Sequence, residues 1–93
     1  MKLVLWDPQK NEWLKNERGI SFEEVLVRMQ AGEILHVYDH PNQLRYPGQK
    51  IMELLVDDYV CLVPFVETES EVFLKTIIPS RKATRKHRGD LHG

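Results

Sequence analysis

The hydrophobic pattern of this 93-residue chain changes its period close to Gly32. Between Pro8 and that glycine the apolar residues recur at the spacing of a helix, and after it they form short runs with the residue types of strands. Helices followed by consecutive strands predict an α+β domain, with the helices packed on an antiparallel sheet. Because a chain of this length buries only about 60–65% of its unfolded surface, we expect a single hydrophobic core.

The first strand and the first helix are predicted from their boundaries. Leu3–Trp6 is an apolar run too short for a helix, and Asp7 and Pro8 close it. Asp7 then fits the N-cap and Pro8 the first position of a helix over residues 9–17, which Gly19 ends. The residues expected to anchor this helix in the core are Trp13 and Leu14.

A capping box marks the start of a second helix. The Ser21 hydroxyl and the Glu24 carboxylate can each bind the backbone N–H group of the other residue. Helical spacing places four apolar residues on one face of this helix: Phe22, Val25, Leu26 and Met29. Gly32 supplies the residue that ends it.

The rest of the chain predicts strands joined by short turns. Residues 34–38 form one strand. Three further β-rich runs predict an antiparallel meander: residues 49–55, 59–66 and 71–78. Pro64 lacks a donor for the strand ladder, which favours a bulge or an edge position there. Pro79 and Ser80 close the sheet and open a short C-terminal helix.

Charge is unevenly distributed, although the net charge is only −1. Residues 80–93 hold five Lys or Arg and one Asp, whereas residues 1–79 hold eight Lys or Arg and thirteen Asp or Glu. If the C-terminal segment is helical, Arg81, Arg85 and Arg88 form one positive stripe. By charge alone, the stripe fits a phosphate-bearing partner, an acidic protein, or a solvated helix end without a partner.

The sequence lacks the motifs of the common cofactors and metals: a Walker loop, a dinucleotide fingerprint, an HExxH pair and a zinc spacing of Cys and His. We therefore expect neither a cofactor nor a metal. The single cysteine, Cys61, is interpreted as a buried strand residue. No apolar run reaches the roughly 20 residues of a membrane span, and Asp7 and Pro8 interrupt the N-terminal stretch before a signal peptide forms, so a cytoplasmic location is predicted.

Polar residues in or beside the predicted sheet are candidates for chemistry. His40 lies at a strand end, where catalytic groups are often displayed, while His36 within the strand is interpreted as structural. Arg45 and Tyr46 can grip a phosphate and stack on a base, or can cap the sheet edge. Lys75 either meets a substrate or pairs across the hairpin with acidic residues, for which the candidates are Glu67, Glu69 and Glu71.

Three sequence blocks occur in the order found in the BrnT family and together span nearly the whole chain. They are Trp6–Asn11 (WDPQKN), Arg18–Glu24 (RGISFEE) and Ser80–Lys86 (SRKATRK). The chain therefore resembles the BrnT toxins of type II toxin–antitoxin systems. That resemblance implies a RelE-like fold and a ribonuclease that cleaves mRNA and so blocks translation. It also implies a co-encoded antitoxin protein as partner, with operator DNA bound only through the antitoxin.

By position, the resemblance implies that Lys10 and Arg81 belong to the RNA-cleaving surface. Cleavage without a metal needs a base for the 2′-hydroxyl group, positive charge for the phosphorane and an acid for the leaving oxygen. Lys10, Lys75 and Arg81 supply charge in this interpretation, and His40 or a lysine serves as acid or base. The residues expected to bind RNA are Lys82, Arg85, Lys86, Arg45 and Tyr46.

A second interpretation remains beside the first. Thr76 stands where the family commonly carries an arginine in its last strand, which favours a catalytically inactive RelE-like module that binds a protein partner or RNA. In either interpretation, residues 1–86 are expected to form one domain and residues 87–93 a disordered end.

Overall fold

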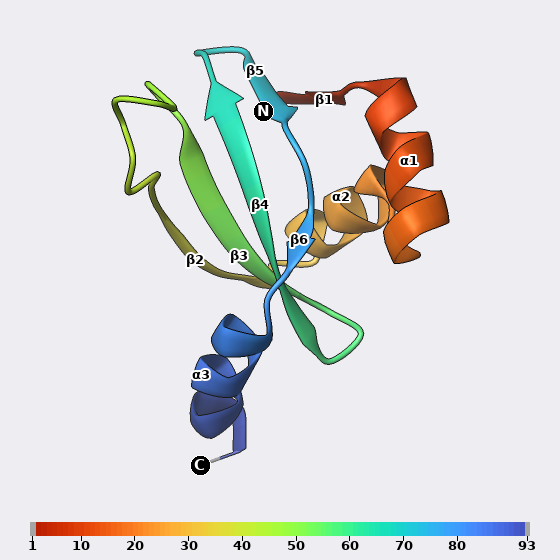
Figure 1. The fold of residues 1–93 in the computed structure, drawn as a ribbon, viewed down its shortest axis with the longest axis vertical. Helices are drawn as coiled ribbons and strands as arrows, with labels where there is room; N and C mark the ends of the chain where they lie inside the picture. The colour runs from red at the N-terminus through yellow and green to blue at the C-terminus, as the bar shows by residue number, and fades with distance from the viewer. Residues whose placement is uncertain (1, 93) are drawn as a thin grey trace.

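Helices and strands follow one another in the order that the hydrophobic pattern predicts. The computed structural model describes the backbone of residues 2–92 and the side chains of residues 2–87. The elements are β1 (Leu3–Trp6), α1 (Pro8–Arg18), α2 (Phe22–Gln30), β2 (Ile34–Asp39), β3 (Lys50–Val56), β4 (Tyr59–Glu67), β5 (Glu71–Leu74), β6 (Ile78–Pro79) and α3 (Arg81–His92). The chain is an α+β domain in which α1 and α2 pack together beside the sheet and α3 lies at one end of it (Figure 1).

The sheet is mixed, in the order β1-β5-β4-β3-β2. Its four strands from β2 to β5 form the predicted antiparallel meander. The expectation of a wholly antiparallel sheet is wrong, because β1 pairs in parallel with β5 and places Val4 opposite Val72. The long connection through α1, α2 and the meander is the crossover that a parallel pair requires.

The last predicted strand run is interrupted at Lys75–Ile77, between β5 and β6. The Lys75 N–H donates to the Pro64 carbonyl oxygen at 2.8 Å. In a strand, the N–H and C=O groups of one residue point to the same side. The nitrogen of Pro64, which carries no hydrogen, therefore also faces Lys75–Ile77, and the ladder of hydrogen bonds stops there. Pairing resumes in β6, where Ile78 lies opposite Leu62. Pro64 therefore occupies a central strand opposite a bulge, and the alternative of an edge position is wrong.

Local caps fix the ends of the first two helices as predicted. The Asp7 carboxylate accepts the Gln9 N–H at 3.0 Å, and α1 ends at Gly19, whose φ of 64° favours glycine. At α2, the Ser21 hydroxyl accepts the Glu24 N–H at 3.2 Å, which is the Ser21 half of the capping box.

Only one of the two predicted anchors of α1 is buried. Leu14 is fully buried in the core, whereas the Trp13 side chain is 43% exposed. The expectation of a buried Trp13 is therefore wrong. The adjacent positions Trp13 and Leu14 point about 100° apart around a helix, so a short surface helix cannot direct both of them into one core.

The core lies between α1, α2 and one face of the sheet. Alternate residues of the central strands point into it: Met52, Leu54 and Val56 from β3, and Cys61, Val63 and Phe65 from β4. The helices supply Leu14, Phe22 and Val25. Because side chains alternate along a strand, the intervening residues of β3 and β4 form the opposite face of the sheet.

Helix α3 packs on the end of that opposite face. Ala83 and Thr84 are buried there, and the Thr84 hydroxyl accepts the Val60 N–H at 2.9 Å. The Ser80 hydroxyl accepts the Ala83 N–H at 3.1 Å, which confirms the predicted helix start. The predicted disordered end begins at His87, but the structure places the His87 side chain in α3 against Glu53. The side chains of residues 88–93, and with them the predicted contribution of Arg88 to the basic stripe, lie outside the described residues.

Candidate functional site

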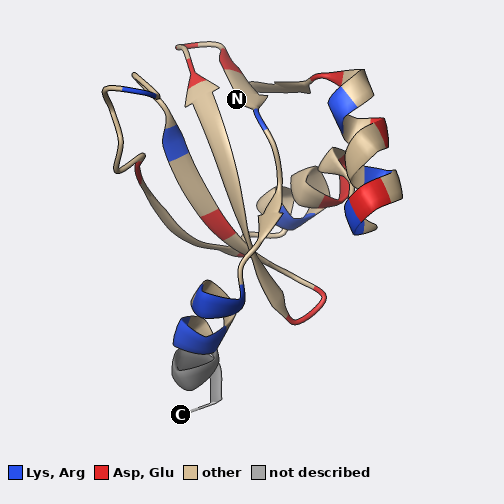
Figure 2. Cartoon of the chain, in the orientation of Figure 1, with Lys and Arg blue, Asp and Glu red and all other residues tan. Residues whose placement is uncertain are grey.

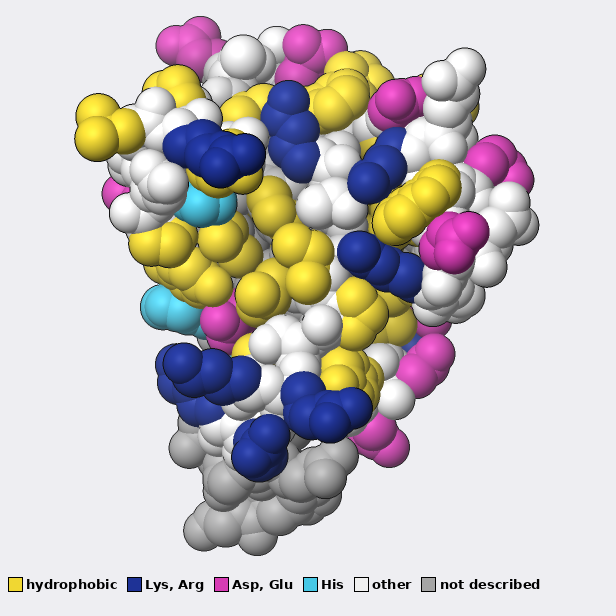
Figure 3. All heavy atoms as spheres, viewed as in Figure 1, with side chains coloured by type: hydrophobic (Ala, Val, Ile, Leu, Met, Phe, Trp, Pro, Cys, Tyr) yellow, Lys and Arg dark blue, Asp and Glu magenta, His cyan; other side chains and the backbone are white. Residues whose placement is uncertain are grey.

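The sheet face opposite α1 and α2 carries an apolar floor with a basic border. In the part of the chain that the structure describes, α3 covers only one end of this face (Figure 1). Pairing across the strands sets the floor residues side by side: Ile51, Leu62, Pro64, Val66 and Phe73. Lys and Arg side chains lie around this floor (Figure 3), and Lys and Arg positions fall on the β2–β3 loop, on α1 and on α3 (Figure 2). We refer to this floor and its border as the open face.

A cavity of about 460 Å³ lies where α3 meets the open face. It is lined by Tyr38, Glu53, Leu62, Ser80, Lys82, Ala83 and Lys86. Apolar side chains thus form part of its wall, while a carboxylate, a phenol and two ammonium groups face the same space. A cavity of this size and mixed lining is typical of a ligand site.

Glu53 is the buried acidic residue of this cavity. It sits in the middle of β3, opposite Leu62, and its side chain is only 8% exposed. The His87 side chain, 13% exposed, reaches it from α3, and the distance from His87 Nε2 to Glu53 Oε1 is 2.6 Å. Because a buried carboxylate is costly without a partner, His87 both stabilises Glu53 and fixes its orientation.

The Tyr38 hydroxyl belongs to the same group. Burial, followed by the negative charge of Glu53 and a hydrogen bond to it, raises the pKa of Tyr38 above its ordinary value. Tyr38 therefore stays protonated at neutral pH and is a hydrogen-bond donor in the cavity.

The basic residues of α3 share one side of the helix. Ala83, Thr84 and His87 form its inner side, and four cationic residues occupy the remaining arc: Arg81, Lys82, Arg85 and Lys86. All four are exposed, and Lys82 and Lys86 line the cavity. Two residues of the predicted stripe, Arg81 and Arg85, have described side chains. Lys82 and Lys86 lie next to them on α3 and line the same cavity as Glu53.

At the β2–β3 loop, three predicted site residues lie together. The ring of His40 is 4.4 Å from that of Tyr46, and the Arg45 guanidinium lies 5.5 Å from the Tyr46 ring. His40 Nδ1 accepts the Asn42 N–H at 3.0 Å. In a neutral His40 ring, Nε2 then carries the hydrogen, so that His40 can donate to a ligand but has no free lone pair to act as a base.

Lys75 extends along the open face, with its Nζ 5.1 Å from the Phe73 ring. Glu67, which was one of its predicted partners, binds Lys2 at 2.7 Å and Lys50 at 3.3 Å instead. Those hydrogen bonds hold the pKa of Glu67 below its ordinary value. Lys75 makes no ion pair within the described residues, so its charge is available to a ligand.

On α1, Lys10 and Arg18 flank the exposed Trp13 ring. Lys10 Nζ is 4.3 Å and Arg18 Cζ is 5.0 Å from its centroid. Arg18 also donates to the carbonyl oxygen of Ile77, in the segment that joins β5 to β6. This hydrogen bond attaches the end of α1 to the border of the open face.

The four residues predicted to be catalytic stand at separate positions: Lys10 on α1, His40 at the loop, Lys75 after β5 and Arg81 on α3. No hydrogen bond or ion pair links any two of them within the described residues. The structure instead brings together three residues that the sequence did not single out: Tyr38 and Glu53 line the cavity, and His87 pairs with Glu53. A signal existed for Glu53, because a charged residue in the middle of an apolar strand run is unusual and needs a partner. Nothing in the sequence pairs Tyr38 or His87 with it.

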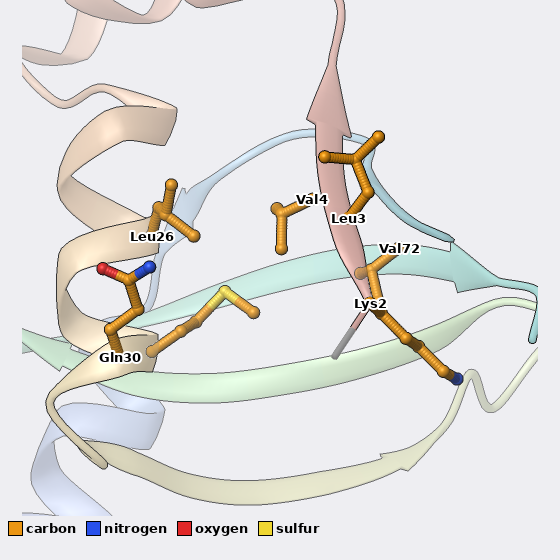
Figure 4. A pocket seen from close by; sticks show the side chains of 7 residues that line it. Lys2, Leu3, Val4, Leu26, Gln30 and Val72 are labelled. Atoms are coloured by element: carbon orange, nitrogen blue, oxygen red, sulfur yellow. The ribbon is translucent and has the colours of Figure 1, made fainter. Parts of the chain in front are cut away.

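A second cavity, of about 400 Å³, lies between α2 and β1 (Figure 4). Its wall is mainly apolar, from Leu3, Val4, Leu26, Met29 and Val72, with Lys2 and Gln30 beside them. It is not lined by a carboxylate, and so lacks the acidic group that Glu53 supplies to the cavity beside α3.

Among the described residues, no group of three or more His, Cys, Asp or Glu side chains is arranged to hold a metal ion. Cys61 is buried, as predicted, and burial raises the pKa of its thiol to about 11. None of the helices in the described part of the chain is long and apolar enough to cross a membrane.

Comparison with known proteins finds no matching family model, no matching curated protein and no matching solved structure. The function is therefore inferred from the chemistry of the open face and its cavity.

Proposed function

We propose that the open face is the RNA-cleaving surface of a metal-independent ribonuclease, the toxin of a type II toxin–antitoxin pair with a RelE-like fold. The sequence blocks that resemble BrnT toxins support this proposal, as does the chemistry of the cavity beside α3. The proposed substrate is single-stranded mRNA, whose cleavage stops translation.

The observation that carries the proposal is the position of Glu53. Its carboxylate lines a cavity with Lys82 and Lys86, and His87 Nε2 lies 2.6 Å from Glu53 Oε1. A base held beside two cations, at the end of an apolar floor with a basic border, is the arrangement that phosphodiester cleavage needs. The apolar floor suits unstacked bases, and the cations suit the phosphates between them.

In the proposed reaction, Glu53 takes the proton of a ribose 2′-hydroxyl group, and the freed oxygen attacks the adjacent phosphorus. The bond from phosphorus to the 5′ oxygen breaks, which leaves a 2′,3′-cyclic phosphate on one fragment. Lys82 and Lys86 stabilise the charge of the phosphorane, and the ammonium group of one of them protonates the departing 5′ oxygen. Tyr38 donates a hydrogen bond within the cavity, and His87 is a positioning residue.

Four other predicted residues have binding roles in this proposal. Arg81 and Arg85 continue the positive surface of α3 away from the cavity, while Lys75 and Arg45 hold phosphates along the floor. Arginine keeps its proton at all accessible pH values, so Arg81 contributes charge and not proton transfer.

The proposed protein partner is a co-encoded antitoxin that covers the basic border. A surface that attracts RNA phosphates also attracts acidic side chains, so one partner can exclude the other. Operator DNA, in this proposal, is bound only through the antitoxin.

Induced expression in a bacterial host tests the function directly. The parent chain is expected to arrest growth and to leave cleaved RNA with 2′,3′-cyclic phosphate ends. Glu53→Gln keeps the shape of the side chain but removes the base, so it is expected to lower the cleavage rate by about 100-fold or more. Glu69→Gln, an exposed carboxylate in the β4–β5 turn, is the matched control and should cleave like the parent.

Two results would count against the proposal. If Glu53→Gln is folded by circular dichroism and cleaves at the rate of the parent, then Glu53 is not the base. If the parent itself leaves RNA intact and does not affect growth, the chain is not a ribonuclease, and the inactive binding module becomes the better interpretation.

A further inference from the structure

We infer that Trp13 is a stacking platform for an RNA base at the border of the open face, where Lys10 and Arg18 bind the adjoining phosphates. The inference rests on the proposed function, because it assigns a second contact to the same RNA strand, outside the cavity in which cleavage is proposed.

The exposure of Trp13 is the first observation. A tryptophan that is 43% exposed leaves a large aromatic surface on which a ligand can pack. The core does not need this side chain, because Leu14 fills the inner side of α1.

The charges around the ring are the second observation. Lys10 Nζ lies 4.3 Å and Arg18 Cζ 5.0 Å from the ring centroid. Two acidic side chains near α1, Glu12 and Glu23, both pair with Lys15, at 3.3 and 3.9 Å. A third, Glu17, lies one turn after Trp13 and is exposed. Lys10 and Arg18 make no ion pair within the described residues, so this cluster carries two positive charges around an aromatic ring.

Arg18 and Lys10 differ in how firmly they are held. The Arg18 guanidinium donates to the Ile77 carbonyl oxygen, so it stays beside the ring. Lys10 makes no hydrogen bond through its side chain within the described residues, and its long stem can rotate. Its ammonium group can therefore leave the ring and bind a phosphate while a base takes its place on the indole.

The position of the cluster favours RNA as the occupant. The Arg18 hydrogen bond attaches it to Lys75–Ile77, the segment whose first residue extends over Phe73 on the open face. On that side of the molecule, Lys or Arg side chains and hydrophobic side chains lie next to one another between α1 and the floor of the open face (Figure 3). A strand that follows the basic border from the cavity thus reaches an aromatic surface with cations on both sides, the combination that binds single-stranded nucleic acid.

Tryptophan fluorescence tests the inference without relying on cleavage. The chain has two tryptophans, and Trp6 is half-buried, with its ring stacked on Phe22 at 5.6 Å. Trp6→Phe keeps an aromatic ring in that stack and leaves Trp13 as the reporter. The probe is a short 2′-O-methyl oligonucleotide, which cannot be cleaved because its 2′ oxygen is blocked. Binding is expected to quench the Trp13 emission, whereas Trp13→Phe of the otherwise unchanged chain should lose most of the quenching.

Affinity gives a second measurement at one fixed salt concentration. Trp13→Ala is expected to bind the oligonucleotide about 5- to 150-fold more weakly, and Trp13→Phe less so, because a phenyl ring still stacks. Val27→Ala removes another exposed apolar side chain, on α2 and 59% exposed, and should bind like the parent.

The outcomes separate this inference from the proposed function. If the oligonucleotide binds and Lys82→Ala weakens it, but Trp13 is not quenched and Trp13→Ala binds normally, the inference is overturned while the function stands. Quenching by poly-glutamate but not by the oligonucleotide would instead make Trp13 a contact for an acidic protein and overturn the inference. If the parent does not bind the oligonucleotide at all, RNA binding at the open face fails, and both ideas fall together.

Discussion

At the scale of single residues, the turn between β3 and β4 is formed by two aspartates in a backbone conformation that favours glycine at the second position. Asp57 has φ 50° and Asp58 has φ 66°, so both lie in the left-handed region. Two-residue hairpins with positive φ at both positions select Asn-Gly or Asp-Gly. The Arg28 guanidinium binds Asp57 at 3.1 Å, which gives the first aspartate a partner that the second does not share.

Asp58→Gly is therefore expected to stabilise the fold by up to about 1 kcal/mol, because glycine adopts positive φ without steric cost. For a domain of this size, that corresponds to a rise in Tm of up to about 8 °C. Thermal unfolding followed by circular dichroism measures it. Glu69→Gly is the control, since Glu69 does not have positive φ, and it should not raise Tm. A Tm of Asp58→Gly at or below that of the parent would contradict the argument.

Cys61 is a buried residue of β4, and its thiol is expected to be unreactive in the folded chain. Burial, with smaller contributions from the Glu24 and Asp57 carboxylates, raises the pKa of its thiol from 9.0 to about 11. The thiolate is the reactive form, so native Cys61 should resist iodoacetamide at pH 8 and react fully once unfolded. Mass spectrometry of the alkylated chain distinguishes the two states, and rapid native labelling would refute this burial.

The raised pKa of Cys61 also makes the stability of the fold depend on pH. The folded pKa of Cys61 is above the unfolded one, so the folded state holds the proton more tightly. This contribution to stability is complete below about pH 9 and is lost as the pH rises from there toward about 11.

At the scale of elements, Asn11 connects the first two helices. It is buried on α1, where its Oδ1 accepts the Phe22 N–H at 2.8 Å and its Nδ2 donates to Glu23 Oε1 at 2.7 Å. One side chain therefore satisfies a buried N–H at the start of α2 and binds a carboxylate in its first turn. The hydrogen bond from Asn11 is the main reason that the pKa of Glu23 lies below its ordinary value.

Asn11→Ala is expected to destabilise the fold by about 2–3 kcal/mol, because the Phe22 N–H would be buried without a partner. Urea unfolding measures the change, and Asn16→Ala, at an exposed position of α1, should cost far less. The stabilisation from the lowered pKa of Glu23 is present above its unfolded pKa and is lost as the pH falls through the folded value. The free energies of unfolding of the two variants should accordingly differ less at acid pH. If both substitutions lower the free energy of unfolding equally at neutral pH, Asn11 does not join the helices.

The elements themselves were mostly predictable, and the exceptions share one cause. Caps and periodicity predicted α1, α2 and the antiparallel strands, because those signals act between residues close in sequence. The parallel partner of β1 and the bulge opposite Pro64 depend on which strands lie side by side, which the local sequence does not contain.

At the scale of the whole molecule, the proposed RNA binding should depend strongly on salt, although the net charge of the chain is −1. What matters is the local concentration of cations around the open face and not the sum over the chain. A plot of the logarithm of the binding constant against the logarithm of salt concentration should be linear, with a slope of about −0.7 for each phosphate neutralised on a single strand.

Lys82→Ala is expected to reduce that slope by about 0.7, because it removes one contact with a phosphate. Lys15→Ala is the matched control, since Lys15 already pairs with Glu12 and Glu23. Titrations of the uncleavable oligonucleotide at several salt concentrations give both slopes. Equal slopes for parent and Lys82→Ala would place the phosphates away from α3.

By itself, the sequence determined the α+β class, the capped helices, the meander and the basic C-terminal helix, because each depends on neighbouring residues. Only the tertiary structure decided which charged groups share a space. It placed Glu53 of β3 against His87 of α3, which lie 34 residues apart, and it left Trp13 outside the core. A carboxylate and its partner from another element meet only after the sheet and α3 have packed, so no local pattern marks the pair.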